Sequence, residues 1–169
     1  FLVRDRYGIK PLYFGLFDNT ILFSSEQKSI LLHPKVSKKI DYEALLEYFT
    51  FQNIFTNQTF LNDISMLEEG HFMTIDIHDK KNPVISLKQY WDYKFSEPEI
   101  ILSKDEYVEE LNRLFSQAVK RQLVSDVELG AYLSGGMDSG SITALSASKF
   151  PQIKTFTCGF DTSSASGIE

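Results

Sequence analysis

The segment YLSGGMDSGS, residues 132–141, combines residue types that can bind a phosphate group. Its adjacent glycines, Gly135 and Gly136, let the main chain approach a ligand closely and adopt positive φ angles. Ser134 and Ser139 add hydroxyl donors on either side. A helical pattern follows, and the first turn of a helix offers unpaired N–H groups and the positive end of its dipole to an anion. The segment therefore predicts a phosphate site.

Asp138 lies inside this segment, and a carboxylate repels a phosphate group unless a cation separates them. Mg²⁺ that is bound between a carboxylate and phosphate oxygens removes this conflict. We therefore interpret the segment as the site of a polyphosphate with its Mg²⁺. Asp138 would be the side chain that binds this Mg²⁺ ion, which the polyphosphate binds as well.

The glycine segment has two other interpretations, a purely structural turn and the common phosphate loop. A tight turn between a strand and a helix also uses glycine for its geometry and Asp or Ser as a cap, and the pattern alone leaves this alternative open. The common phosphate loop of kinases and GTPases requires a lysine after the glycines, which is absent here. His33, His71 and His78 are too widely separated to suggest a metal site.

The elements around the segment predict a βαβ unit, and hence a parallel sheet. A buried strand is expected over residues 127–133, a helix from about Ser139 to Phe150 that ends before Pro151, and a second strand over residues 153–160. An amphipathic helix precedes them, opened by the capping-box pair Ser103 and Glu106. Its expected apolar face consists of Tyr107, Val108, Leu111, Leu114, Phe115, Ala118, Val119 and Leu123.

The first half of the chain is expected to be rich in β-structure. Apolar runs predict strands, with a hairpin turn at Asp18-Asn19. The expected strands cover residues 1–5, 11–17, 20–25, 70–77 and 84–91. Two helices are expected. The first is capped by Ser25 and stopped by Pro34, and the second is capped by Asp41 and carries Leu45, Leu46 and Phe49 at helical spacing.

Residues 92–100 differ in composition from the segments before and after them and are interpreted as a linker between two domains. Trp91 is expected to anchor this domain junction. Arg4 and Asp5 are expected to form a structural ion pair beside the turn at residues 7–11.

Composition limits the class of protein. The chain has 169 residues, 43% of them hydrophobic and 24% charged, which is typical of a globular protein. The net charge of −6 argues against a nucleic-acid partner, and the absence of a long apolar run argues against a membrane span. The single cysteine, Cys158, fits a reducing, cytoplasmic setting. Because the chain starts at Phe1 and its last residues, 161–169, suggest no terminal element, we expect an internal piece of a longer protein.

The motifs resemble a known family. SGGMDS is similar to the pyrophosphate-binding loop S-G-G-x-D-S of the ATP pyrophosphatases. RDRYGIKPLYF at residues 4–14 and FSSEQKSIL at residues 23–31 resemble the late part of the glutaminase domain of glutamine-hydrolysing asparagine synthetases. The segment from FTFQNIF to YWDY, residues 49–93, resembles the region that leads into their synthetase domain. Order and spacing match over nearly the whole chain.

The resemblance implies a mixed α/β fold in two parts. Residues 1–92 would be the C-terminal part of an αββα, Ntn-type, class II glutamine amidotransferase domain with its connector. Residues 93–169 would begin a parallel-sheet ATP pyrophosphatase domain, similar to the adenine nucleotide α-hydrolases.

The resemblance also implies an activity, which is the amidation of aspartate with glutamine as nitrogen donor, through β-aspartyl-AMP. ATP with Mg²⁺ would bind at Ser134, Gly135, Gly136, Asp138 and Ser139. Main-chain groups at Tyr132 and Cys158 would hold the adenine. The family's N-terminal catalytic cysteine is absent, and Cys158 lies in the other domain, so no glutaminase catalytic residue is assigned and the chain alone is not expected to turn over. The resemblance is compatible with a homodimer.

The chain departs from the family pattern at two places. Glu68-Glu69 precede Gly70-His71 where the family commonly has two prolines, and Gly140 follows Ser139 where a second serine is usual. Two alternatives stay open. One is a relative that acts on another carboxylate, such as a β-lactam synthetase or a polysaccharide amidotransferase, and the other is a non-catalytic ATP-binding module.

Overall fold

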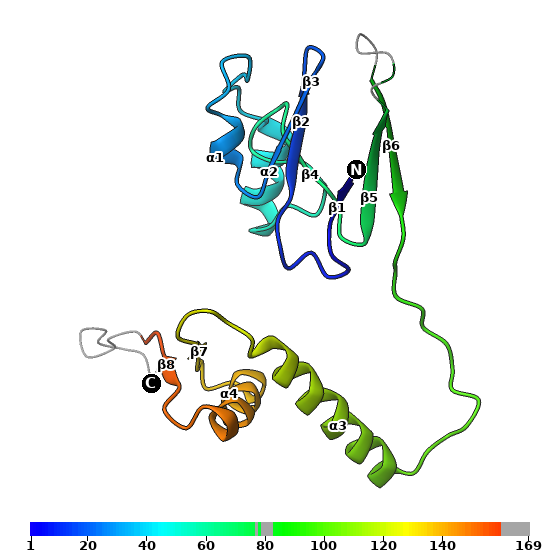
Figure 1. Ribbon diagram of the computed structural model, residues 1–169, viewed down its shortest axis with the longest axis vertical. Helices are drawn as coiled ribbons and strands as arrows, with labels where there is room; N and C mark the ends of the chain where they lie inside the picture. The colour runs from blue at the N-terminus through cyan, green and yellow to red at the C-terminus, as the bar shows by residue number, and fades with distance from the viewer. Residues whose placement is uncertain (77, 79–82, 160–169) are drawn as a thin grey trace. The chain divides into compact units, whose positions relative to one another are not determined.

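The computed structural model describes residues 1–76, 78 and 83–159, and these form a mixed α/β protein, as predicted. The chain divides into two compact units, Phe1–Ser96 and Glu97–Glu169 (Figure 1). Residue 77 of the predicted strand 70–77, residue 160 of the predicted strand 153–160 and the predicted unstructured end at residues 161–169 lie outside the described residues. Over the described residues, no helix has the length and apolar character needed to cross a membrane.

Unit 1 contains two small antiparallel sheets. The first has the order β1-β5-β6 and the second the order β3-β2-β4. The strands are β1 (Leu2–Val3), β2 (Tyr13–Phe17), β3 (Thr20–Ser24), β4 (Ser65–Met66), β5 (His71–Asp76) and β6 (Val84–Gln89). All were predicted except β4, which is only two residues long and has no alternation that a sequence pattern could detect.

The hairpin between β2 and β3 is the clearest local feature of unit 1 (Figure 1). Phe17 pairs with Thr20, so the predicted residues Asp18 and Asn19 form a two-residue turn. Asp18 has φ 52°, a left-handed conformation that Asp tolerates better than most residues. The predicted hairpin is therefore confirmed.

Two helices lie in unit 1. The helix α1 (Gln27–Ile30) is a single turn whose N-cap residue is Glu26, so the predicted cap at Ser25 is wrong. The helix ends at Ile30, before the predicted stop at Pro34. The helix α2 (Tyr42–Phe51) has the predicted cap, because the Asp41 carboxylate accepts hydrogen bonds from the N–H groups of residues 43 and 44.

The apolar side chains at helical spacing in α2 are not the ones that it buries most fully. Ala44 is fully buried, whereas Leu46 and Phe49 are 69% and 73% exposed. Spacing along a helix shows which side chains share a face, but it does not show whether another element covers that face. In the described part of the chain, that face of α2 is largely uncovered.

The core of unit 1 consists of two clusters of buried side chains. One gathers residues from β2, α1 and the segments that follow them, and the other joins β1 to β5. The first consists of Phe17, Ile30, Val36 and Ile64, and the second of Leu2, Leu67 and Met73. Burial of these apolar side chains is the main favourable contribution to the folding of the unit.

Arg4 and Asp5 hold the turn between β1 and β2, but they do not pair with each other as predicted. The Arg4 guanidinium is buried and donates hydrogen bonds to the carbonyl oxygens of Leu67, Gly8 and Lys10 at 2.7, 2.9 and 3.2 Å. The Asp5 carboxylate accepts hydrogen bonds from the N–H groups of Lys10, Tyr7 and Ile9 at 3.0 to 3.1 Å. Both side chains therefore stabilise the main chain of the turn.

The beginning of the linker packs against this turn. Gly70 has φ 64°, and a Cβ atom there would lie 2.5 Å from the Trp91 carbonyl oxygen, so the close approach requires glycine. The rings of Tyr7 and Trp91 have centroids 5.1 Å apart, and those of Trp91 and Tyr93 are 4.7 Å apart. Trp91 thus packs against this end of unit 1, and its role at the junction stays a prediction.

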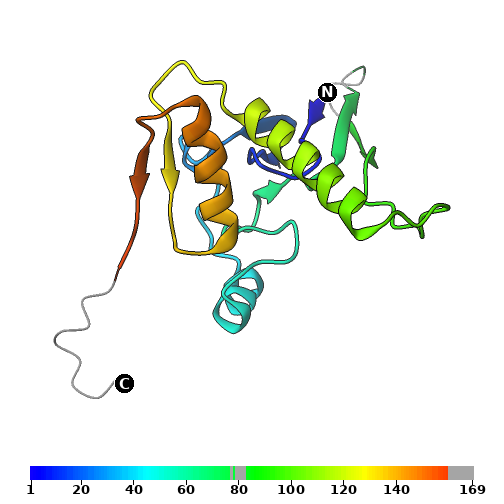
Figure 2. The same ribbon diagram turned by 90° about the horizontal axis from the view of Figure 1, so that it is seen from below.

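Unit 2 is a βαβ unit preceded by a long helix. It contains α3 (Lys104–Gln122), β7 (Gly130–Tyr132), α4 (Met137–Lys149) and β8 (Lys154–Phe156). The two strands are parallel, and Figure 2 shows them side by side with α4 along one face. The parallel sheet predicted for this part of the chain is confirmed, and α4 starts two residues earlier than the expected position 139.

The capping box of α3 is confirmed, because the Ser103 hydroxyl accepts from the Glu106 N–H while the Glu106 carboxylate accepts from the Ser103 N–H. The predicted apolar face is only partly buried. Val119 is buried, but the apolar side chains of the first three turns are exposed. The helix α3 contacts α4, and the buried residue Val119 lies in the last turns of α3.

Asp5 predicts a dependence of stability on acid pH. The hydrogen bond from the Lys10 N–H, followed by those of Ile9 and Tyr7, lowers the pKa of Asp5 below its ordinary value of 3.8. A lowered carboxyl pKa contributes stability that is complete above the unfolded-state pKa and is lost as the pH falls through the folded-state pKa. We expect Asp5→Asn to lower the free energy of unfolding at neutral pH and to weaken its fall below pH 3.8, measured by urea unfolding at a series of pH values. An identical pH dependence in both proteins would contradict this role.

Candidate functional site

The glycine segment lies at the carboxyl edge of the parallel strands. β7 leads directly into it, and main-chain contacts beside it continue the pairing past the strand ends. The Leu133 N–H donates to the Phe156 carbonyl oxygen at 2.9 Å, and the Thr157 hydroxyl donates to the Leu133 carbonyl oxygen at 2.7 Å. Open parallel sheets bind ligands beyond the carboxyl ends of their strands, so the position suits a binding loop.

The two glycines shape the loop in different ways. Gly135 has φ 82°, which other L-residues adopt only with strain, and a Cβ atom there would have no neighbour within 4 Å. Gly136 is the N-cap residue of α4, with φ −77° and ψ 157°. A Cβ atom on Gly136 would lie 3.5 Å from the Ser134 hydroxyl oxygen. Gly135 is therefore needed for the turn, and the surface above it is open.

The start of α4 has no side-chain cap. Among the described residues, the side chains of Asp41 and Ser103 cap the helices α2 and α3. Gly136 is the N-cap residue of α4 and makes no side-chain hydrogen bond. The first N–H groups of a helix have no partner within the helix. The first turn of α4 therefore presents donors and the positive end of its dipole beside an open loop, an arrangement that favours an anion.

Ser134 and Ser139 are brought together by the turn. Their hydroxyl oxygens lie 2.9 Å apart, and the Ser139 hydroxyl oxygen also accepts from the Ser134 N–H at 3.2 Å. The Ser139 hydroxyl donates to the Gly136 carbonyl oxygen at 3.2 Å. The predicted pair of hydroxyl groups therefore flanks the glycines in space as well as in sequence.

Asp138 lies in the first turn of α4 and is exposed. Within the described residues, no group of three or more His, Cys, Asp and Glu side chains is placed to hold a metal ion. A single carboxylate does not form a protein-built metal site, but it suits Mg²⁺, which is commonly bound by one or two carboxylates together with phosphate oxygens and water. The residues present therefore fit a Mg²⁺ ion that arrives with a polyphosphate.

The two positions predicted to contact adenine lie at the same edge. Tyr132 ends β7 and pairs in register with Phe156, and its side chain is 84% exposed. Cys158 lies two residues past the end of β8 and is exposed. β7 is not the buried strand that was predicted, since Gly130 and Tyr132 are exposed. In the described part of unit 2, α4 covers one face of a sheet of only two strands.

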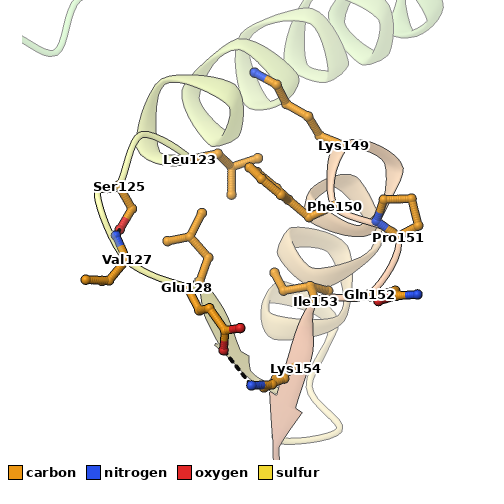
Figure 3. Close-up of a pocket in the computed structure, with 11 residues that line it drawn as sticks. Leu123, Ser125, Val127, Glu128, Lys149, Phe150, Pro151, Gln152, Ile153 and Lys154 are labelled. Carbon is orange, nitrogen blue, oxygen red and sulfur yellow. Dashed lines mark hydrogen bonds and ion pairs between the residues drawn. The ribbon is translucent and has the colours of Figure 1, made fainter.

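A pocket of about 670 Å³ lies at the opposite edge of this sheet (Figure 3). Its walls are the segments that lead into β7 and β8 and the end of α4. Leu123, Phe150 and Ile153 form much of its apolar surface, and an ion pair between Lys154 and Glu128 joins the two segments (Figure 3). We place the functional site at the glycine loop, because in the described part of unit 2 no helix begins at the amino edge of the sheet.

Two residues at the site were missed by the sequence analysis. Thr157 ties the chain after β8 to the start of the loop, and a single hydroxyl residue after a strand carries no recognisable pattern. Gly130 lets the Phe156 ring approach β7, since a Cβ atom there would lie 2.8 Å from the ring. A glycine inside a strand is a signal of such an approach, and the sequence did contain it.

Comparison with known proteins gives a consistent result for both units. A family model described as a glutamine amidotransferase domain matches residues 1–91, and one described as asparagine synthase matches residues 110–168. The chain is 31% identical over 166 residues to the glutamine-hydrolyzing asparagine synthetase 1 of Bacillus subtilis strain 168, which covers 98% of the chain. It is 36% identical over 151 residues to the glutamine-hydrolyzing asparagine synthetase 3 of the same organism, which covers 89% of the chain.

The chain spans about a quarter of the length of these curated relatives, 25% of the first and 24% of the second. The second family match includes the whole glycine loop, α4 and β8.

Gly135 in the loop and Gly140 in α4 provide a matched test of the backbone geometry. Neither Gly135 nor Gly140 has an atom within 4 Å of an added Cβ, but only Gly135 has a positive φ. We expect Gly140→Ala, inside the helix, to raise the free energy of unfolding by about 0.5–1 kcal/mol. Gly135→Ala is expected to lower it by about 1–2 kcal/mol because of the left-handed conformation. Urea unfolding of both variants measures these changes, and shifts in the same direction would contradict the loop geometry.

Proposed function

This chain belongs to the family of glutamine-hydrolysing asparagine synthetases, and on this premise we propose that the full-length protein makes asparagine from aspartate, glutamine and ATP. The chain would be part of a longer enzyme, in agreement with the quarter of its relatives' length that it spans. The predicted boundary between residues 92 and 93 would separate its glutaminase and synthetase parts. The first would have an Ntn-type fold and the second an ATP pyrophosphatase fold.

The observation that carries the proposal is the uncapped start of α4 behind the two glycines. The loop follows a parallel strand, places two hydroxyl groups beside the glycines and leaves the space over Gly135 open. Its segment SGGMDS lies within the part of the chain that matches asparagine synthase. A polyphosphate is the ligand that best combines with these donors.

We assign the following roles at the loop. The main chain at Gly135 and Gly136 and the Ser134 hydroxyl would hold the β- and γ-phosphates of ATP, and Ser139 would complete the ATP-binding loop beside them. Asp138 would bind Mg²⁺, whose contribution is to neutralise phosphate charge. Main-chain groups at Tyr132 and Cys158 would contact the adenine, because they follow neighbouring parallel strands at the same edge.

In the proposed reaction, a carboxylate oxygen of the aspartate side chain attacks the α-phosphorus of ATP. The bond to the bridging oxygen breaks, which gives β-aspartyl-AMP and pyrophosphate. Ammonia, released from glutamine in the glutaminase part and carried through an internal tunnel, attacks the activated carbonyl carbon and expels AMP. The contribution of this chain would be to position ATP and to stabilise the charge that develops on the departing pyrophosphate.

The proposal also covers glutamine hydrolysis, location and oligomeric state. No glutaminase catalytic residue is assigned to this chain, and the chain alone is not expected to catalyse synthesis. The cytoplasmic location and the homodimer stay predictions.

The decisive experiment combines the full-length protein with MgATP, glutamine and aspartate and analyses nucleotides and amino acids together. We expect AMP, pyrophosphate and asparagine in equal amounts, and only when aspartate is present. AMP formation that ignores aspartate but responds to another carboxylate would keep the ATP chemistry and change the substrate. No cleavage of ATP with any acceptor would contradict the proposal and favour a non-catalytic module.

Asp138→Ala tests the role of the carboxylate in the same assay. We expect synthesis to be lost while glutamine hydrolysis is largely retained, because the substitution removes only the proposed metal ligand. Asp105→Ala is the matched control, since Asp105 also lies in the first turn of a helix, α3. Synthesis at the wild-type rate by the Asp138 variant would exclude the proposed role, and an equal loss in the Asp105 variant would indicate a general effect on folding.

A further inference from the structure

The two serine hydroxyl groups of the loop have no proton free for a ligand in this structure. A hydroxyl group has one hydrogen to donate and two lone pairs that accept. The Ser139 hydroxyl donates its hydrogen to the Gly136 carbonyl oxygen. The contact between the two hydroxyl oxygens then requires Ser134 to be the donor. The Ser139 oxygen also accepts from the Ser134 N–H, so both of its lone pairs are occupied.

Each of these bonds fixes a different part of the turn. The bond from the Ser134 N–H joins the end of the strand segment to the first turn of α4 across Gly135 and Gly136. The Gly136 carbonyl oxygen accepts two hydrogen bonds. The first helical bond of α4 comes from the Gly140 N–H at 3.0 Å, and the Ser139 hydroxyl donates to the other lone pair. The Ser139 hydroxyl therefore lies at the centre of the loop, where it contacts the Ser134 N–H, the Ser134 hydroxyl and the Gly136 carbonyl oxygen.

From this count we propose that Ser139 is a positioning residue, which holds the loop in its open turn, and that Ser134 is the hydroxyl donor to the phosphate. The inference rests on the proposed function, because it concerns the same anion site. On binding, the Ser134 hydroxyl rotates its hydrogen from the Ser139 oxygen to a phosphate oxygen. The Ser134 N–H bond and the Gly136 bond of Ser139 stay in place and keep the main-chain donors directed at the anion.

The composition of the first turn makes this division of roles specific to the chain. The residue after Ser139 is Gly140, so no neighbouring hydroxyl group can replace Ser139 at the centre of the loop. Two serines thus serve the whole loop, one for its shape and one for its ligand.

Three variants of the full-length protein separate the roles of the serines. Ser139→Ala removes the acceptor of the Ser134 N–H, and Ser139→Thr keeps the hydroxyl group. Ser134→Ala keeps the main-chain N–H at position 134 and removes only the proposed donor. Two quantities are measured for each protein. They are the hydrogen-exchange rate of the position 134 amide without ligand, and the Kd for pyrophosphate with Mg²⁺ by calorimetry.

We expect both alanine variants to bind pyrophosphate about tenfold more weakly, since each loses hydrogen bonds that the anion site requires. Only Ser139→Ala should also speed exchange at position 134, by about tenfold or more. Ser139→Thr should restore both quantities, which a loss of folding or of side-chain volume would not produce.

Weakened affinity in Ser139→Ala without faster exchange would overturn the positioning role and make Ser139 a direct ligand. Unchanged affinity in Ser134→Ala would overturn the donor role. If the wild-type protein bound no pyrophosphate while exchange at position 134 followed the expected pattern, the proposed function would fail and the positioning of the loop by Ser139 would stand.

Discussion

Main-chain N–H and C=O groups that helices and sheets leave unpaired need other partners, and this requirement shapes both units. In unit 1 the partners are supplied by side chains. Arg4 donates to three carbonyl oxygens and Asp5 accepts from three N–H groups, so the turn between β1 and β2 is held without regular structure. In unit 2 the first turn of α4 lacks such a side chain, and the unpaired donors become the basis of a binding site.

The site depends on the direction of the strands. Two parallel strands need a crossover, and α4 provides it, which places the amino end of the helix at the carboxyl edge of β7. The same edge collects the loop, the end of β7 and the chain after β8. The pocket at the other edge is lined by apolar side chains together with Lys149 and the ion pair of Lys154 with Glu128, and no helix begins among its described lining residues. Local electrostatics, and not pocket size, therefore identifies the site.

Features that depend on a few adjacent residues were predicted well. The capping box of α3, the Asp41 cap, the hairpin at Asp18 and the βαβ unit were all confirmed, because each is determined by interactions within the segment itself. The predicted burial of β7 failed, and the apolar spacing of the helices did not indicate how far each face is covered. The apolar faces of α2 and α3 and the strand β7 are largely exposed in the described chain, since an amphipathic pattern does not say what packs against it.

By itself the sequence determined the residue types of the glycine loop, their spacing and the strand and helix on either side. These followed from short-range physics: glycine for a positive φ, serine and aspartate near a helix start, and apolar runs of suitable length. Only the tertiary structure decided which polar groups form hydrogen bonds with each other. The separation of Arg4 from Asp5, the three partners of Ser139 and the bond from Thr157 each join groups whose distance depends on the folded path of the main chain. Hydrogen bonds need atomic positions within about 3.5 Å, which a linear pattern cannot supply.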